Sequence, residues 1–359
     1  MEFELDSNLS LLVNNSVRKV CVLSGLDYSF DDELSYVIPY LESQGFSVEV
    51  RTLPFTYNDT EVPLFVCGTQ NFSRSDCIRF ENFILEGGKA FVAAQPYTVA
   101  LEGNWSVEEK KNYFARSLNT FGMYFNEGLV CDLQNFTLSM YNDSDSTGKS
   151  VAPNTEKVAY PFWPVISSKT NTENKNIVNG LTLFWPSSLT LDNEVSLMEG
   201  FTVKADLYTS NESWRNKKIE GVYNTNPFTC EKNNSGYSKQ LISCRLEKNN
   251  ELRLYLYCNQ YAFTKTLVSF SSSQASLDLR SFSFLEDILL ELNNECELVS
   301  VKNKNKFDTS LYKVDSGEFY SKAKSVLLLC ILIPLLFYVV LYLVFYLKRK
   351  FFIRKKINA

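Results

Sequence analysis

The pattern of apolar and polar positions predicts strands that alternate with helices in the first part of the chain. The run RKVCVLS at 18–24 is apolar and ends at Gly25. Apolar positions from Leu34 to Leu41 then have helical spacing, and FSVEVRTL at 46–53 alternates as a strand does. This order predicts a βαβ unit.

The same alternation continues toward residue 140. It predicts further strands at 62–68, 89–95 and 128–132, and helices at 75–86 and 107–121. Strands and helices that alternate at this pitch are typical of a mostly parallel sheet covered on both faces. We therefore predict a Rossmann-like α/β domain over 18–140, preceded by an N-terminal lead of residues 1–17.

A polar stretch at 140–156 marks the boundary of a second part that is richer in strands. We predict a second, β-rich α/β subdomain over 157–304, followed by a linker over 305–324. Its predicted elements are strands at 181–191, 203–210 and 252–259, an amphipathic helix at 282–292 and a final strand at 297–304.

Residues 325–347 form a run of 23 without a charge. A helix of that length spans about 35 Å, enough to cross a hydrocarbon core of about 30 Å, so the run predicts one C-terminal transmembrane helix in contact with membrane lipid. Pro334 is compatible with such a helix. The basic tail at 348–359 places the C-terminus in the cytoplasm and the bulk of the chain outside, by the positive-inside rule.

The first residues, MEFELDSNLS, are acidic and lack the apolar region of a signal peptide. We therefore expect either that the reading frame begins upstream, with a further membrane helix, or that the soluble part stays in the cytoplasm.

Cysteine usage and charge exclude several classes of function. The nine cysteines include no C-x-x-C pair, which argues against a metal cage or a dense disulfide framework. One bridge among Cys230, Cys244, Cys258 and Cys296 stays open, as does the use of nine N-x-S/T sequons. The net charge of −5 argues against a nucleic-acid partner.

The absence of histidine excludes His-dependent nucleophilic sites and His-containing zinc sites. Cys67 precedes Gly68 after a strand, as in a nucleophile elbow, but without a histidine base we interpret it as a small buried residue. The GGKA at 87–90 and the GKS at 148–150 lack the residues that complete a P-loop. We predict that the chain is not an enzyme and binds no cofactor.

Acidic residues at predicted strand ends are the candidate pocket residues. Asp27, Asp132 and Asp206 could line a pocket at the carboxyl edge of the sheet, where doubly wound folds bind ligands, or could cap helices and turns. Trp163, Trp185 and Trp214 could form a recognition surface; we favour packing of loops onto the sheet.

The order of segments suggests a family. FILEGGKAFVAAQP and FGMYFNEGLVCD are followed by YPFWPVI at 160–166, LFWPSSLTL at 183–191 and CELVSVKNK before the predicted membrane helix. Over residues 18–352 this order resembles the gliding-motility-type (GldG-like) ABC transporter auxiliary proteins. The chain has Gly25, Leu26 and Asp27 where members carry a Gly-His-Glu-like turn, and it lacks their N-terminal membrane helix.

The resemblance implies a noncatalytic subunit, anchored in the inner membrane, that acts beside an ABC permease and a separate ATPase. Tyr338 and Tyr342 would share one face of the anchor and could contact the permease, or could face lipid. The alternative is a stand-alone single-pass surface receptor or adhesion protein, which predicts disulfides and glycans. The sequence names no transported substrate.

Overall fold

A computed structural model describes part of the chain, and all described residues belong to one compact unit that spans Met1–Lys306. No helix within the described residues is both long and apolar enough to cross a bilayer. The predicted span at 325–347, Tyr338, Tyr342, Cys230 and the GKS at 148–150 lie outside them. The described ranges are 17–28, 31–101, 105–110, 112–141, 155–167, 178–216, 218, 223–226, 236–271 and 278–304.

Four parallel strands follow one another in the first part of the chain. β1 (Arg18–Ser24) and β2 (Phe46–Arg51) are joined through α2 (Val37–Ser43), and β3 (Leu64–Cys67) continues through α3 (Arg74–Leu85) to β4 (Ala90–Ala93). β1 pairs with β2 on one side and with β3 on the other, all in parallel. The predicted βαβ units are confirmed.

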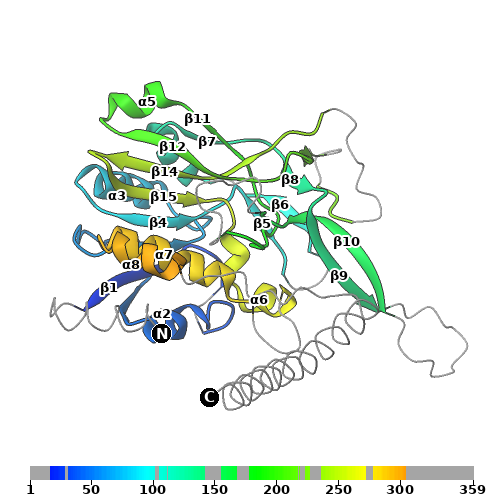
Figure 1. Ribbon diagram of the computed structural model, residues 1–359. Helices are drawn as coiled ribbons and strands as arrows, with labels where there is room; N and C mark the ends of the chain where they lie inside the picture. Colours follow the sequence, from blue (N-terminus) through cyan, green and yellow to red (C-terminus); the bar gives the residue numbers. More distant parts are fainter. Residues whose placement is uncertain are drawn as a thin grey trace, which may run out of the picture. The chain divides into compact units, whose positions relative to one another are not determined.

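The connection from β1 to β2 through α2 and the connection from β3 to β4 through α3 run in opposite directions from the centre of the sheet. Because such crossovers are right-handed, α2 and α3 cover opposite faces. α7 (Arg280–Leu292) contacts α2 and lies on its face, whereas α4 (Phe114–Thr120) contacts α3. The sheet is therefore covered on both sides (Figure 1).

Strands from the second part of the chain complete the same sheet. β15 (Glu251–Tyr257) pairs in parallel with β4, and β14 (Leu241–Lys248) and β12 (Thr202–Tyr208) extend it in antiparallel order. The seven strands have the order β12-β14-β15-β4-β3-β1-β2. Strands from both predicted α/β parts thus hydrogen-bond in one mixed, mostly parallel sheet.

Within the described residues the remaining strands form four two-stranded sheets. They pair β5 (Tyr97–Val99) with β6 (Val107–Glu109), β7 (Met123–Phe125) with β11 (Leu189–Leu191), β8 (Leu129–Asp132) with β13 (Ser213–Asn216), and β9 (Asn135–Tyr141) with β10 (Thr155–Pro164). The other helices are α5 (Asn193–Met198), the 3₁₀ helix η1 (Gln260–Phe263), α6 (Lys265–Ser271) and α8 (Cys296–Lys304).

Aromatic side chains form the core on both faces of the sheet. On the α3 face, Phe80 packs against Phe55 and Phe114 with ring centroids 5.9 and 4.9 Å away. On the α7 face, Phe91 stacks on Tyr255 at 5.5 Å. Burial on both faces explains why the central strands are continuous apolar runs.

Three predicted elements differ from the structure. Only Phe114–Thr120 of the predicted helix at 107–121 is helical, because Val107 joins β6 and the side chain of Asn112 accepts a hydrogen bond from the N–H of Phe114 at the helix start. The strand predicted at 181–191 is reduced to β11, since Trp185 has a positive φ of 48° and precedes a proline.

The third difference is the strand predicted at 297–304, which is helix α8. A segment of eight residues fits the period of a helix and the period of a strand about equally well. Contacts with neighbouring elements therefore decide which of the two forms. In the helix, the ammonium of Lys302 reaches the carboxylates of Glu286 and Asp287 on α7, at 2.7 and 2.6 Å.

Candidate functional site

The carboxyl ends of β1 and β3 form the point where the strand order reverses, the usual ligand site of open α/β sheets. Gly25 donates its N–H to the carbonyl of Cys67 at 3.0 Å and accepts from the N–H of Asn71 at 3.0 Å. A Cβ atom on Gly25 would lie 2.4 Å from the carbonyl oxygen of Gly68. Glycine here allows two loops to meet at the edge of the sheet.

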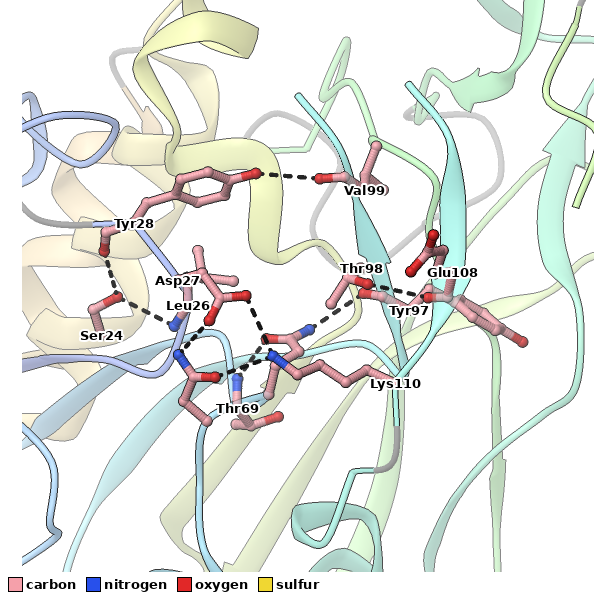
Figure 2. A network of polar contacts seen from close by, with 12 residues as sticks. Ser24, Leu26, Asp27, Tyr28, Thr69, Tyr97, Thr98, Val99, Glu108 and Lys110 are labelled. Atoms are coloured by element: carbon pink, nitrogen blue, oxygen red, sulfur yellow. Dashed lines mark hydrogen bonds and ion pairs between the residues drawn. The ribbon is translucent and has the colours of Figure 1, made fainter. Parts of the chain in front are cut away.

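Asp27 and Asn71, on these two loops, form a polar triad with Lys110, which directly follows β6. The amide of Asn71 donates to one carboxylate oxygen of Asp27 at 2.8 Å, and the ammonium of Lys110 contacts the other at 3.3 Å and Asn71 Oδ1 at 3.2 Å. Figure 2 shows Asp27 and Lys110 pointing toward each other. The hydrogen bond from Asn71, with help from Lys110, lowers the pKa of Asp27. Asp27 is therefore held as an exposed, paired anion.

A layer of buried glutamines lies at the ends of β3, β4 and β15. The amide nitrogen of Gln70 donates to Gln260 Oε1 at 2.7 Å and to the carbonyl of Tyr97 at 3.2 Å, and Gln260 donates to the same carbonyl at 3.2 Å. Gln95 is fully buried, and within the described residues its side-chain amide has no hydrogen-bond partner. The side-chain amides of Gln70 and Gln260 thus connect the segments after β3, β4 and β15 through hydrogen bonds, and neither side chain is titratable.

A cavity of about 720 Å³ opens at this edge, between the segment after β1 and helix α6. Tyr28, Asp32 and Glu33 line one side, and Lys265 and Phe270 of α6 are among the residues opposite. Its size falls within the range of about 300–1,000 Å³ that is typical of small-molecule sites.

The carboxylate of Glu33 joins the two walls of this cavity. It accepts hydrogen bonds from the N–H of Thr266 at 3.0 Å and from the Thr266 hydroxyl at 2.7 Å, and the Glu33 carbonyl accepts from the N–H of Lys265 at 2.6 Å. These bonds fix the first turn of α6 against the segment that follows β1.

An aromatic group adjoins the cavity at Phe270. The Phe270 ring lies 5.3 Å from that of Trp105, which in turn contacts Trp163 at 5.1 Å and Trp185 at 5.6 Å. Trp105 and Trp185 have positive φ angles of 53° and 48°, which is rare for bulky residues. Strained backbone of this kind clusters at functional sites, so the aromatic group marks the same region as the cavity.

The structure separates the three predicted aspartates. Asp27 lies at the strand-order reversal, as described. Asp132 is fully buried at the end of β8, where it accepts from the Ser210 hydroxyl at 2.6 Å and the Gln134 N–H at 2.8 Å; burial raises its pKa, and the hydrogen bonds partly offset this. Asp206 lies within β12, not at its end, and accepts from the Tyr255 hydroxyl.

Cys67 is fully buried at the end of β3, and its thiol lies 3.5 Å from the carbonyl of Gln260. Burial raises the pKa of this thiol far above its usual range. The side chain therefore behaves as a small core residue, as the sequence indicates. Gly87, in the GGKA, follows the end of α3 with φ 108°, as a helix-terminating residue does.

The three predicted tryptophans lie in the core. Trp163, Trp185 and Trp214 are almost completely buried, which confirms their packing role. Of the four cysteines left open for a bridge, Cys244, Cys258 and Cys296 are free.

Several residues of this edge were missed by sequence reasoning. Lys110 and Asn71 are far from Asp27 along the chain, and the sequence marks Asn71 only as the first residue of an N-x-S sequon. Glu33 directly precedes the positions from Leu34 to Leu41 whose spacing predicts a helix, yet α2 begins at Val37 and Glu33 binds α6. An acidic residue just before a helical pattern can begin the helix or bind another segment, and the local sequence is the same in both cases.

Comparisons with known proteins give a family and weak structural likenesses. A family model described as an ABC-type uncharacterized transport system matches residues 17–251. No curated protein matches the chain. Among solved structures, a ThuA-like protein from Parabacteroides merdae is 12% identical with a TM-score of 0.27, over 73% of this chain and 92% of that one. A β-galactosidase from Bifidobacterium adolescentis is 10% identical with a TM-score of 0.18, over 51% and 95%.

Proposed function

The chain belongs to the ABC-type uncharacterized transport system family, and from this we propose that it is a noncatalytic auxiliary subunit of an ABC-type, gliding-motility-like transporter. The match over residues 17–251 carries the proposal. In this role the soluble part binds a separate permease and ATPase, and ATP hydrolysis belongs to the ATPase alone.

The chemistry of the carboxyl edge supports a binding role. The Cys67 thiol is buried with a raised pKa, and the Asp27 carboxylate is paired with Asn71 and Lys110. The chain has no histidine to act as a base. Activated nucleophiles need an adjacent base or a lowered pKa, and Cys67 has neither.

Co-purification tests the proposal. The full-length chain, tagged after Ala359, is expressed with the permease and ATPase of its own transport system and extracted in detergent. We expect all three to elute together, and substitution of the P-loop lysine of the ATPase to abolish ATP hydrolysis. Elution of the chain alone, while the permease and ATPase remain together, would refute the role.

We also propose that the chain is anchored by residues 325–347, with its bulk extracytoplasmic and the tail at 348–359 cytoplasmic. The uncharged run and its basic flank support this orientation. Tyr338 and Tyr342 are proposed to contact the permease. Replacing both by leucine should then weaken co-purification, while leaving the chain in the membrane.

Cys296 provides a reporter for the orientation, because it is exposed, whereas the other described cysteines are buried. In a chain with Cys230→Ser and Cys330→Ser, a membrane-impermeant maleimide should label Cys296 in intact spheroplasts. The same chain with Cys296→Ser is the control. Labelling only after the membrane is permeabilised would place the bulk of the chain in the cytoplasm and refute the orientation.

The alternative of a surface receptor or adhesion protein predicts stabilising disulfides. Cys244, Cys258 and Cys296, three of the four cysteines left open for a bridge, are free, so they do not favour it.

A further inference from the structure

The seven-stranded sheet ends at β12 on one side and at β2 on the other. An outer strand presents unpaired N–H and C=O groups, and proteins commonly protect such an edge with β-bulges or with lysine. β12 has both, because its register with β14 shifts at two places between Ala205 and Tyr208 and because Lys204 is exposed. The edge at β12 is therefore poorly suited to pair with a further strand.

β2 has neither of these protections. It pairs with β1 in one unbroken register from Phe46 to Arg51, and it contains no proline or lysine. Within the described residues no strand pairs with its outer side. The side chains of Glu49 and Arg51 are 50% and 53% exposed, and Val50 between them is 41% exposed. This edge is thus regular, and its side chains are accessible.

The charges of β2 are complementary to a second copy of the same strand. In an antiparallel pair, opposite charges that face each other are favourable and like charges are unfavourable. When two copies of β2 pair in this way with Val50 opposite Val50, each Glu49 lies opposite an Arg51 of the other copy. A two-fold axis produces that ion pair twice and brings the two exposed valine side chains together.

The neighbouring registers are less favourable. A two-fold axis at Glu49 places Glu49 opposite Glu49, and an axis at Arg51 places Arg51 opposite Arg51. An axis at Val48 places Glu49 opposite Ser47 and brings no opposite charges together. Charge therefore favours the register that is centred on Val50.

We propose that two copies of this chain associate through their β2 strands, in antiparallel order and with Val50 at the two-fold axis. The two seven-stranded sheets then form one continuous sheet across the interface. One strand from each copy is a small interface, so the dimer dissociates on dilution. The inference goes beyond the transport role and does not depend on it.

Disulfide cross-linking of the full-length chain in a nonionic detergent tests the register. The background is Cys230→Ser, Cys296→Ser and Cys330→Ser, because the other described cysteines are buried. Val50→Cys places two cysteines directly opposite each other, with Cβ atoms about 5 Å apart, so oxidation should yield a covalent dimer. Val48→Cys is the matched control, because its two cysteines lie about 13 Å apart along the strands and should not cross-link. Equal dimer yields for the two variants, or no dimer for Val50→Cys, would overturn the proposal.

Exchange of the two charges tests the same pairing without a disulfide. Glu49→Arg or Arg51→Glu alone places like charges opposite each other at both symmetric positions. Each should raise the dimer dissociation constant about tenfold or more, as measured by sedimentation equilibrium. The variant with both substitutions should dimerise again, and so should an equimolar mixture of the two single variants, because opposite charges then face each other.

Asp31→Arg, at an exposed position outside β2, is the control for these charge changes and should leave the dissociation constant unaltered. Circular dichroism checks that every variant is folded. A monomeric unaltered chain at every concentration would overturn the proposal, as would a mixture of the single variants that dimerises no better than either alone.

Discussion

The carbonyl oxygen of Gly68 lies 2.4 Å from the position that a Cβ atom would take on Gly25. This contact joins the loops that follow β1 and β3, on which Asp27 and Asn71 lie. The geometry of the candidate site therefore depends on the absence of a side chain at one position.

Gly25→Ala should destabilise the fold by about 3 kcal/mol or more, because a backbone oxygen must move to admit the methyl group. The matched control is Gly200→Ala, where no atom lies within 4 Å of the added Cβ and only the positive φ of 75° is unfavourable. That change should cost about 1 kcal/mol. Urea unfolding measures both, and equal losses would contradict the close contact.

Two substitutions in the glutamine layer should change the free energy of unfolding in opposite directions. Gln95→Leu should raise the free energy of unfolding by about 1–2 kcal/mol, because it removes a buried amide that has no partner within the described residues. Gln70→Leu should lower it by about 1–3 kcal/mol, since it leaves the carbonyl of Tyr97 and the N–H of Thr69 without these bonds. Thermal unfolding of both variants checks the contrast, and a loss for Gln95→Leu would refute it.

Asp76 links the start of α3 to the loop after β2. It accepts from the N–H of Ser73 at 2.9 Å and from the N–H of Phe55 at 2.7 Å. Burial alone raises the pKa of Asp76, but the hydrogen bond from the Ser73 hydroxyl, together with these two backbone bonds, outweighs it and holds the pKa below the usual 3.8. Its contribution to stability is therefore present above pH 3.8 and is lost as the pH falls through the folded-state pKa.

Asp76→Asn should cost about 1.5–3 kcal/mol at neutral pH, and the difference from the unaltered chain should shrink below about pH 4. Urea unfolding from pH 7 to pH 3 measures this. Asp31→Asn, at an exposed position, is the control and should track the unaltered chain. A difference that is constant with pH would show that the charge of Asp76 is not responsible.

Lys302 of α8 forms ion pairs with two buried carboxylates of α7, those of Glu286 and Asp287. Lys302→Met should cost about 3–5 kcal/mol, because Glu286 and Asp287 are 3% and 2% exposed and would lose their counter-charge. Lys204→Met removes an exposed bridge to Glu247 and should cost about 1 kcal/mol or less. Restoration of stability by adding Glu286→Gln to Lys302→Met would support the electrostatic cause, and similar costs for the two lysine variants would contradict it.

Local patterns predicted the parallel part of the fold well, because the apolar runs of β1, β3 and β4 are bounded by glycines and helices with clear spacing. Predictions from local patterns were wrong where contacts between distant parts of the chain determine the secondary structure. The helix α8 depends on the bond from Lys302 to α7, and Trp185 breaks a strand that its neighbours would continue.

The candidate site was predicted only at Asp27. Its partners Asn71 and Lys110, and the cavity formed by Glu33 and α6, come from segments that only the folded sheet brings together. Asp132, predicted on the same grounds as Asp27, binds Ser210 in a buried turn. A strand-end aspartate in sequence does not reveal which edge of which sheet it will occupy.

The parallel pairing of β4 with β15 has a consequence for biosynthesis. During translation, β4 leaves the ribosome with one edge uncovered until the chain from Ala93 to Tyr257 has been made, which takes about 10–30 s at roughly 5–20 residues per second. The nascent chain carries an apolar open edge through that interval and is exposed to aggregation. A fragment cut where the family match ends, at residue 251, would keep that edge permanently and should require a chaperone to remain in solution.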